Sequence, residues 1–238
     1  MMKIVFLAMF VLVSEYGVAQ INLNKLKEKV LGESSNVSAD EVAQGLKEAL
    51  TNGVSKGSDL ASQVDGYFKN PEIKIPFPPE VRHVEARLRQ MGLGSEVDKF
   101  VLSLNRAAED AAKEAKEVFI TAVRQMTIQD AWSILKGQQN AATEYLRKTT
   151  SVELKSRFKP IIHNSLAKVN ATRYYSDLVN TYNKIPLVQK VNPNLDDYAT
   201  DKASDGIFVM IAKEEKNIRD NPAARTTELL KKVFNAQK

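Results

Sequence analysis

The apolar residues of this 238-residue chain recur mostly at the spacing of an α-helix. Residues 38–41 have the Ser-x-x-Glu form of a helix-capping box, and Val42, Leu46 and Leu50 follow it on one helical face. This pattern predicts a helix from about residue 39 to about residue 54. A second stripe, at residues 81–91, lies between Pro79 and a closing Gly92 and predicts another helix.

Capping patterns and prolines place the remaining helices. Helix starts are expected at residues 127–130 and 150–153, and Pro186 should end a helix that begins near residue 171 and buries Tyr174, Leu178 and Tyr182. A helix over residues 195–219 contains six consecutive apolar residues, 207–212, which we expect to be buried all round because they leave no polar face. A last helix should start at Pro222, with these residues facing inward: Leu229, Leu230, Val233 and Phe234.

The longest predicted helix covers residues 95–126 and carries a heptad-like seam with alanine at its middle. Glu109, Lys113 and Glu117 are expected on its solvent side as opposite-charge pairs. A dimeric coiled coil is one interpretation of the seam. A central helix packed inside its own domain is favoured, because Phe100 and other large side chains widen the apolar face.

Two Pro-containing stretches, residues 70–79 and 185–193, resist the helical interpretation and are expected to be extended. They could pair as a small ribbon, strap the helices, or act as a lid or peptide-docking arm. The predicted fold class is therefore all-α: a single multi-helix domain over residues 38–238, with a long central helix and these short extended segments. Residues 20–37 form an N-terminal segment before it.

The first residues match a secretory signal peptide. Lys3 precedes the apolar run 4–13, and small side chains lead to Ala19, so we expect cleavage near Ala19 and an exported, periplasmic protein. A short membrane anchor is the alternative. It is disfavoured because Glu15 interrupts the apolar run, which is shorter than the roughly twenty residues that a spanning helix needs. No transmembrane segment is expected in the mature chain.

Composition limits the partners and the chemistry. The chain has 34 Lys and Arg against 29 Asp and Glu and no cysteine, so its net charge is +5 and no disulfide or N-terminal lipidated cysteine is expected. The basic surface favours anionic partners such as phospholipid head groups or acidic glycans, although so modest a charge also fits ordinary solubility. We expect no specific nucleic-acid binding.

Short catalytic patterns occur without the context that they need. Residues 53–57 read Gly-x-Ser-x-Gly, residues 165–168 read Ser-x-x-Lys, and residues 204–206 read Ser-Asp-Gly, but hydrolases place such serines on a β-sheet that is not expected here. His83 and His163 are the only histidines, and neither has a cysteine or a second histidine three or four residues away. No metal site, no phosphate-binding loop and no cofactor is predicted.

Polar side chains within the apolar stripes are the candidate ligand-binding residues. Buried charges must pair or line a cavity, so these groups form either a structural salt-bridge network or a site for an anionic or amphipathic ligand. Two of them lie in the first turn of the last predicted helix, which attracts anions. The candidates are Asn105, Arg106, Asp130, Trp132, Tyr145, Arg147, Arg173, Arg225 and Thr226.

Three longer motifs, residues 125–137, 141–147 and 205–227, resemble the bacterial domain of unknown function family 4197, and residues 73–78 and 105–109 also fit its pattern. The resemblance covers residues 38–234. It implies an exported, mostly helical protein of Gram-negative bacteria, and it implies no activity, cofactor or catalytic residue.

The expected function is non-catalytic binding of an anionic or lipid-like ligand in the cell envelope. The apolar part of the ligand is expected against helix 207–212 and the alanine seam, with Arg147, Arg173 or Arg225 neutralising its charge. A protein–protein interaction or envelope structural module, for example a homodimer through the long helix, is the alternative. An uncharacterised hydrolase or other enzyme, with Asp130, Glu109 or His163 as acid or base, comes third.

Overall fold

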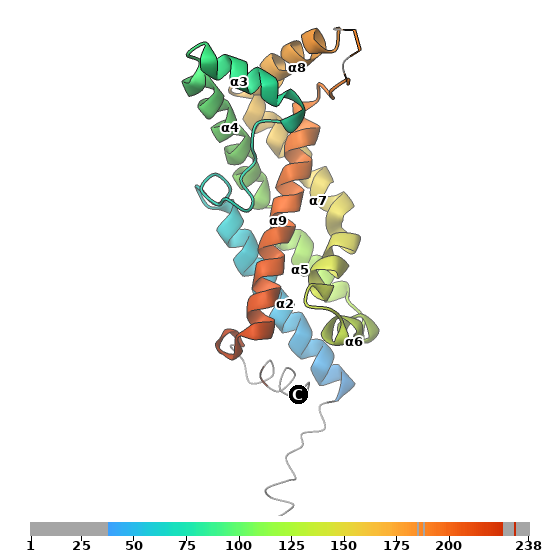
Figure 1. Cartoon of the computed structure of the whole chain (residues 1–238). Helices are drawn as coiled ribbons and strands as arrows, with labels where there is room; N and C mark the ends of the chain where they lie inside the picture. The colour runs from blue at the N-terminus through green and yellow to red at the C-terminus, as the bar shows by residue number, and fades with distance from the viewer. Residues whose placement is uncertain (1–37, 185, 188, 226–230, 232–238) are drawn as a thin grey trace, which may run out of the picture. The chain divides into compact units, whose positions relative to one another are not determined.

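The computed structural model describes residues 38–184, 186–187, 189–225 and 231, and this part of the chain is all-α, as predicted. It contains no β-strand, and it lies within one compact unit. None of its helices is long and apolar enough to cross a membrane. Its elements, shown in Figure 1, are α2 (Ala39–Ser62), η1 (Pro79–Val81), α3 (Arg82–Gln90), α4 (Gly94–Ala112), α5 (Ala115–Gln125), α6 (Ile128–Lys136), α7 (Ala141–Ala167), α8 (Ala171–Tyr182), α9 (Leu195–Asp220) and η2 (Pro222–Ala224).

Helix α9 packs on α2, α4, α7 and α8 and carries the centre of the core. Four residues of the apolar run predicted on it are buried: Ile207, Phe208, Met210 and Ile211. The run is not buried all round, as had been expected, because Val209 and Ala212 are partly exposed at the edge of the core. This helix, rather than the one expected over residues 95–126, holds the central position.

Helix α2 begins at the predicted capping box, with Ser38 and Glu41 bonded to each other's backbone N–H groups. It continues to Ser62, beyond the predicted end, because Gly53 and Gly57 do not break it but face α9. A β-carbon on Gly57 would lie 3.0 Å from Ile211 Cδ1. The Gly-x-Ser-x-Gly pattern is therefore a helix-packing surface and not a nucleophile turn.

The single helix predicted over residues 95–126 is wrong: it is two helices, α4 and α5, broken at residues 113–114. At the break, the Glu114 N–H donates to Ala111 O, three residues earlier, instead of to the residue four positions earlier as in an α-helix. The seam itself is buried against the chain's own helices, α4 on α7 and α5 on α2 and α7, because its alanines allow close approach. Glu109 is also not on the solvent side, as had been expected, but buried.

The helix start expected at Thr150 is wrong as well, because α7 begins at Ala141. The Thr150 hydroxyl donates to Leu146 O inside the helix instead of capping a new one. The true start is held by Glu215 of α9, whose buried carboxylate accepts hydrogen bonds from the N–H groups of Ala142 and Thr143. A cap supplied by a distant helix leaves no pattern in the local sequence.

The two segments predicted to be extended are straps rather than a ribbon. They are not extended throughout, because residues 71–73 and 186–187 form turns and Pro79 begins η1. Ile73, Ile75 and Phe77 bury every second side chain of the first, as the period-two pattern predicted. The Asn105 side chain holds this strap: its amide donates to Ile75 O and accepts from Ile75 N–H, both at 2.8 Å. Asn183 holds the second strap at Val191 in the same way.

The signal peptide, the cleavage site at Ala19 and the inward-facing residues of the last predicted helix lie outside the described residues.

Candidate functional site

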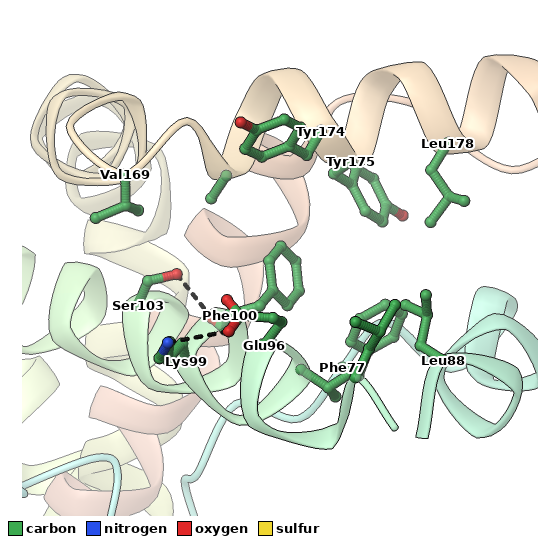
Figure 2. Close-up of a pocket in the computed structure, with 13 residues that line it drawn as sticks. Phe77, Leu88, Glu96, Lys99, Phe100, Ser103, Val169, Tyr174, Tyr175 and Leu178 are labelled. Atoms are coloured by element: carbon green, nitrogen blue, oxygen red, sulfur yellow. Dashed lines mark hydrogen bonds and ion pairs between the residues drawn. The ribbon is translucent and has the colours of Figure 1, made fainter. Parts of the chain in front are cut away.

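An open apolar groove of about 760 Å³ lies between α4 and α8. Figure 2 shows α8 along one wall and α4 along the other, with the end of the first strap and α3 closing one end. Apolar side chains make up most of the lining, which consists of Phe77, Leu88, Leu93, Glu96, Val97, Lys99, Phe100, Ser103, Val169, Ala171, Tyr174, Tyr175 and Leu178.

Helix α8 supplies its wall because it has two apolar rows. The row Ala171, Tyr175 and Val179 is buried in the core. The neighbouring row, with Tyr174 and Leu178, lines the groove, and Tyr174 is 67% exposed. The prediction that Tyr174 belongs to the buried face is therefore wrong. The sequence alone does not show which of two adjacent apolar rows the other helices cover.

Aromatic rings form the base of the groove. Phe77 of the strap and Phe100 of α4 have ring centroids 5.0 Å apart, and Phe100 stacks on Tyr175 at 6.5 Å. Burial raises the pKa of Tyr175 to about 12, so its hydroxyl stays protonated at neutral pH. This base is uncharged and has a weakly polar edge.

The few polar groups of the groove are at its rim. Lys99 Nζ pairs with Glu96 Oε1 at 3.0 Å, and both side chains are mostly exposed. Ser103 Oγ donates to Phe100 O at 2.7 Å within its own helix. The lining holds no histidine and no group of carboxylates. Such a surface can bind an apolar body and a charged end, but it offers no pair of groups for acid–base catalysis.

The structure places Asn105 at the first strap and Arg106 at the turn that follows α2. Asn105 clamps Ile75, as described above. Arg106 bonds to Glu109 Oε2 at 2.6 Å and to Asp65 Oδ1 at 2.7 Å, and Glu109 also accepts the N–H groups of Tyr67 and Phe68. These side chains fix the turn that follows α2.

Asp130 and Trp132 lie on α6. Asp130 closes a capping box with Thr127, whose backbone N–H bond lowers the pKa of the Asp130 carboxyl. Lys136 lies over the Trp132 ring at 4.8 Å.

Tyr145 and Arg147 lie on α7, apart from the groove. Tyr145 is half-buried against the core, and burial raises its pKa. The Arg147 guanidinium stacks on the Phe208 ring at 4.4 Å and lies 3.4 Å from Asp205.

Arg225 is buried beyond the end of α9, where its side chain donates to Ile218 O and Arg219 O. It thus caps the last carbonyls of a helix. Thr226 lies outside the described residues. Arg173 is exposed on α8 directly before Tyr174, but neither it nor any other described candidate lines the groove.

A smaller polar hollow of about 410 Å³ lies beside His163 on α7. His163 Nδ1 is 2.6 Å from Asp196 Oδ2, and Thr172 donates to the other oxygen of Asp196. The described residues contain no group of His, Asp and Glu side chains that could hold a metal ion. The pair ties α7, α8 and the start of α9 together.

Sequence reasoning did not assign the groove residues to a site. Leu88, Phe100, Tyr174 and Leu178 had each been noted as apolar stripe positions and interpreted as core. The sequence did contain one indication of the groove, an excess of apolar residues. Phe100 lies beside the seam, and α8 carries more apolar residues than one buried face needs.

The part of the chain that the structure describes is thus an all-helical fold with an open, mainly apolar groove. The chain belongs to the family described as Protein of unknown function (DUF4197), whose model matches residues 36–235. This match confirms the resemblance found in the sequence. No curated protein and no solved structure matches the chain.

Proposed function

We propose that this protein binds an amphipathic, anionic molecule non-catalytically, with the apolar part of the ligand in the groove between α4 and α8. The groove carries the proposal. Its volume of about 760 Å³ lies within the range of small-molecule sites, roughly 300–1,000 Å³, and its lining is mainly apolar with a few polar groups at the rim.

The ligand position differs from the one expected from the sequence. Helix 207–212 and the alanine seam are covered by the chain's own helices, so they leave no space for an acyl chain. The groove provides apolar surface that is open to solvent. Lys99 lines the groove, and the exposed Lys168 and Arg173 directly precede the lining residues Val169 and Tyr174 in the sequence, which supports a negatively charged head group.

We further propose that binding takes place after export, in the periplasm. The apolar run 4–13 behind Lys3 and the small residues before position 20 support export.

A groove-filling variant tests the binding site. Ser103→Trp places an indole inside the groove, and equilibrium dialysis with radiolabelled laurate should show affinity at least about tenfold lower than that of the wild type. Dodecanol, which has the same chain without the charge, should bind the wild type about threefold more weakly than laurate.

Ser133→Trp is the matched control. Like Ser103, Ser133 lies on a helix and its hydroxyl donates to a carbonyl of the same helix, but it is exposed on α6 outside the groove. The affinity of the Ser133→Trp variant for laurate should equal that of the wild type. Equal binding by Ser103→Trp and the wild type would show that the groove is not the site.

A further inference from the structure

Exposed apolar residues gather at the end of the molecule that carries the groove. Nine large apolar side chains are exposed in the described part of the chain, and five of them lie on the α3–α4 turn or on α8 and its flanks. They are Met91, Leu93, Val169, Tyr174 and Leu187. Single exposed apolar residues are ordinary, but a group at one end that surrounds a groove is typical of a contact surface.

The same end carries basic residues without ion-pair partners. Lys168, Arg173, Lys184 and Lys190 are exposed on α8 and its flanks, and none of them forms a salt bridge within the described residues. Over residues 168–190 the only acidic residue is Asp177, so four basic minus one acidic residue gives +3 of the chain's net +5. On α7, by contrast, Lys155, Arg157 and Lys159 are all paired.

Helix α3 extends this basic end. His83 of α3 contacts the Tyr182 ring of α8, with centroids 5.1 Å apart, so the two helices meet there (Figure 1). Arg82 and Arg87 of α3 are exposed and also lack an ion pair in the described structure. Basic residues without an ion pair in the described structure therefore lie on both helices at this end.

Leu187 is the most prominent apolar residue of this end. It is fully exposed in the loop after α8, and its backbone has a φ of +66°. A left-handed backbone conformation is unfavourable for leucine. The exposure of its apolar side chain to water is unfavourable as well. Transfer of the Leu187 side chain from water into an apolar environment is therefore expected to be favourable in free energy.

We propose that α8, its flanks and the neighbouring end of α3 form a docking surface for an anionic phospholipid bilayer. Basic residues flanked by exposed aromatic and aliphatic side chains fit the interface of such a bilayer, with the charges at the phosphates and the apolar groups below them. Tyr174 and Val169 belong both to this surface and to the groove lining, so the groove opens where the bilayer would lie. In naming the bilayer as the source of the ligand, this inference rests on the proposed function.

Vesicle sedimentation tests the docking surface. The wild type should bind vesicles of equal parts phosphatidylglycerol and phosphatidylcholine, and it should bind pure phosphatidylcholine vesicles far more weakly. Each basic residue near an anionic surface strengthens binding about fivefold, so reversing Arg173, Lys184 and Lys190 to Glu should weaken binding at least about a hundredfold.

A triple variant with the same change of net charge is the control. Arg124, Lys148 and Lys202 are exposed, lack salt bridges in the described residues and lie outside the docking surface. Their reversal to Glu should weaken binding by less than about tenfold through the general field of the protein. An equal loss in both triple variants, or equal binding to the two kinds of vesicle, would overturn the proposal.

Leu187→Asn tests the apolar contribution. Asn tolerates the left-handed backbone, so the fold should be kept, while vesicle binding should fall several-fold because the inserted side chain is lost. The groove-filled Ser103→Trp should still bind vesicles. If the wild type binds laurate but no anionic vesicles, the docking surface is wrong and the ligand groove stands.

Discussion

At the scale of single residues, two asparagines determine where the extended segments lie. Asn105 and Asn183 each use one amide group to satisfy both the N–H and the C=O of a strap residue, Ile75 and Val191. A strap without strand partners would otherwise leave buried backbone groups unpaired. Asn105 was recognisable in the sequence as a polar residue among apolar ones, but its partner lies 30 residues away.

Replacing Asn105 with Ala should lower the free energy of unfolding by about 3 kcal/mol, because the N–H and C=O of Ile75 remain buried without partners. Urea denaturation followed by circular dichroism measures this change. Asn180→Ala, on the exposed side of α8, should change the same free energy by less than about 0.5 kcal/mol. A loss below about 1 kcal/mol for Asn105→Ala would contradict the clamp.

At the scale of elements, glycines decide how closely the chain approaches α9. Gly53 and Gly57 of α2 face Ile218 and Ile211 of α9, and Gly206 of α9 lies under the Tyr67 ring. The three glycines differ in how far the side chain that a new β-carbon would contact can move away. Tyr67 is held by its hydroxyl, which donates to Ala203 O at 2.6 Å, and it is fully buried.

Gly206→Ala should destabilise the protein by about 2 kcal/mol, although Ala in a helix interior is intrinsically better by about 1 kcal/mol. The new β-carbon would lie 2.6 Å from Tyr67 Cε1, and the ring cannot withdraw without losing its hydrogen bond. Thermal unfolding measures the effect. In Gly53→Ala the nearest atom is the terminal methyl of Ile218 at 3.3 Å, so the melting temperature should stay equal or rise. A lower melting temperature for Gly53→Ala than for Gly206→Ala would contradict this explanation.

At the scale of the whole molecule, the alanine seam of α4 and α5 is internal. Ala108, Ala111 and Ala115 are fully buried against the chain's own helices, so a second copy has no access to this face. A dimer through the seam, one of the interpretations open from the sequence, would require these helices to separate.

Ala108→Leu should therefore overpack the core and lower the free energy of unfolding by about 2 kcal/mol. In a dimeric coiled coil the same change would enlarge the apolar contact and raise stability, and the unfolding midpoint would depend on protein concentration. Urea unfolding at two protein concentrations separates the two cases. Ala86→Leu, exposed on α3, is the control and should have little effect.

Local sequence patterns suffice for the helical class, the burial of most of residues 207–212, the alternation within the first strap and the capping boxes at Ser38 and Thr127. Each depends on side chains a few residues apart, so the pattern is local. The tertiary structure decided the break at residues 113–114, the start of α7 under Glu215, and the groove. These depend on which apolar rows other helices cover and on which distant backbone groups need a partner. Tyr174 and Tyr175 are neighbours in the sequence, and packing alone makes one an exposed wall of the groove and the other part of its buried base.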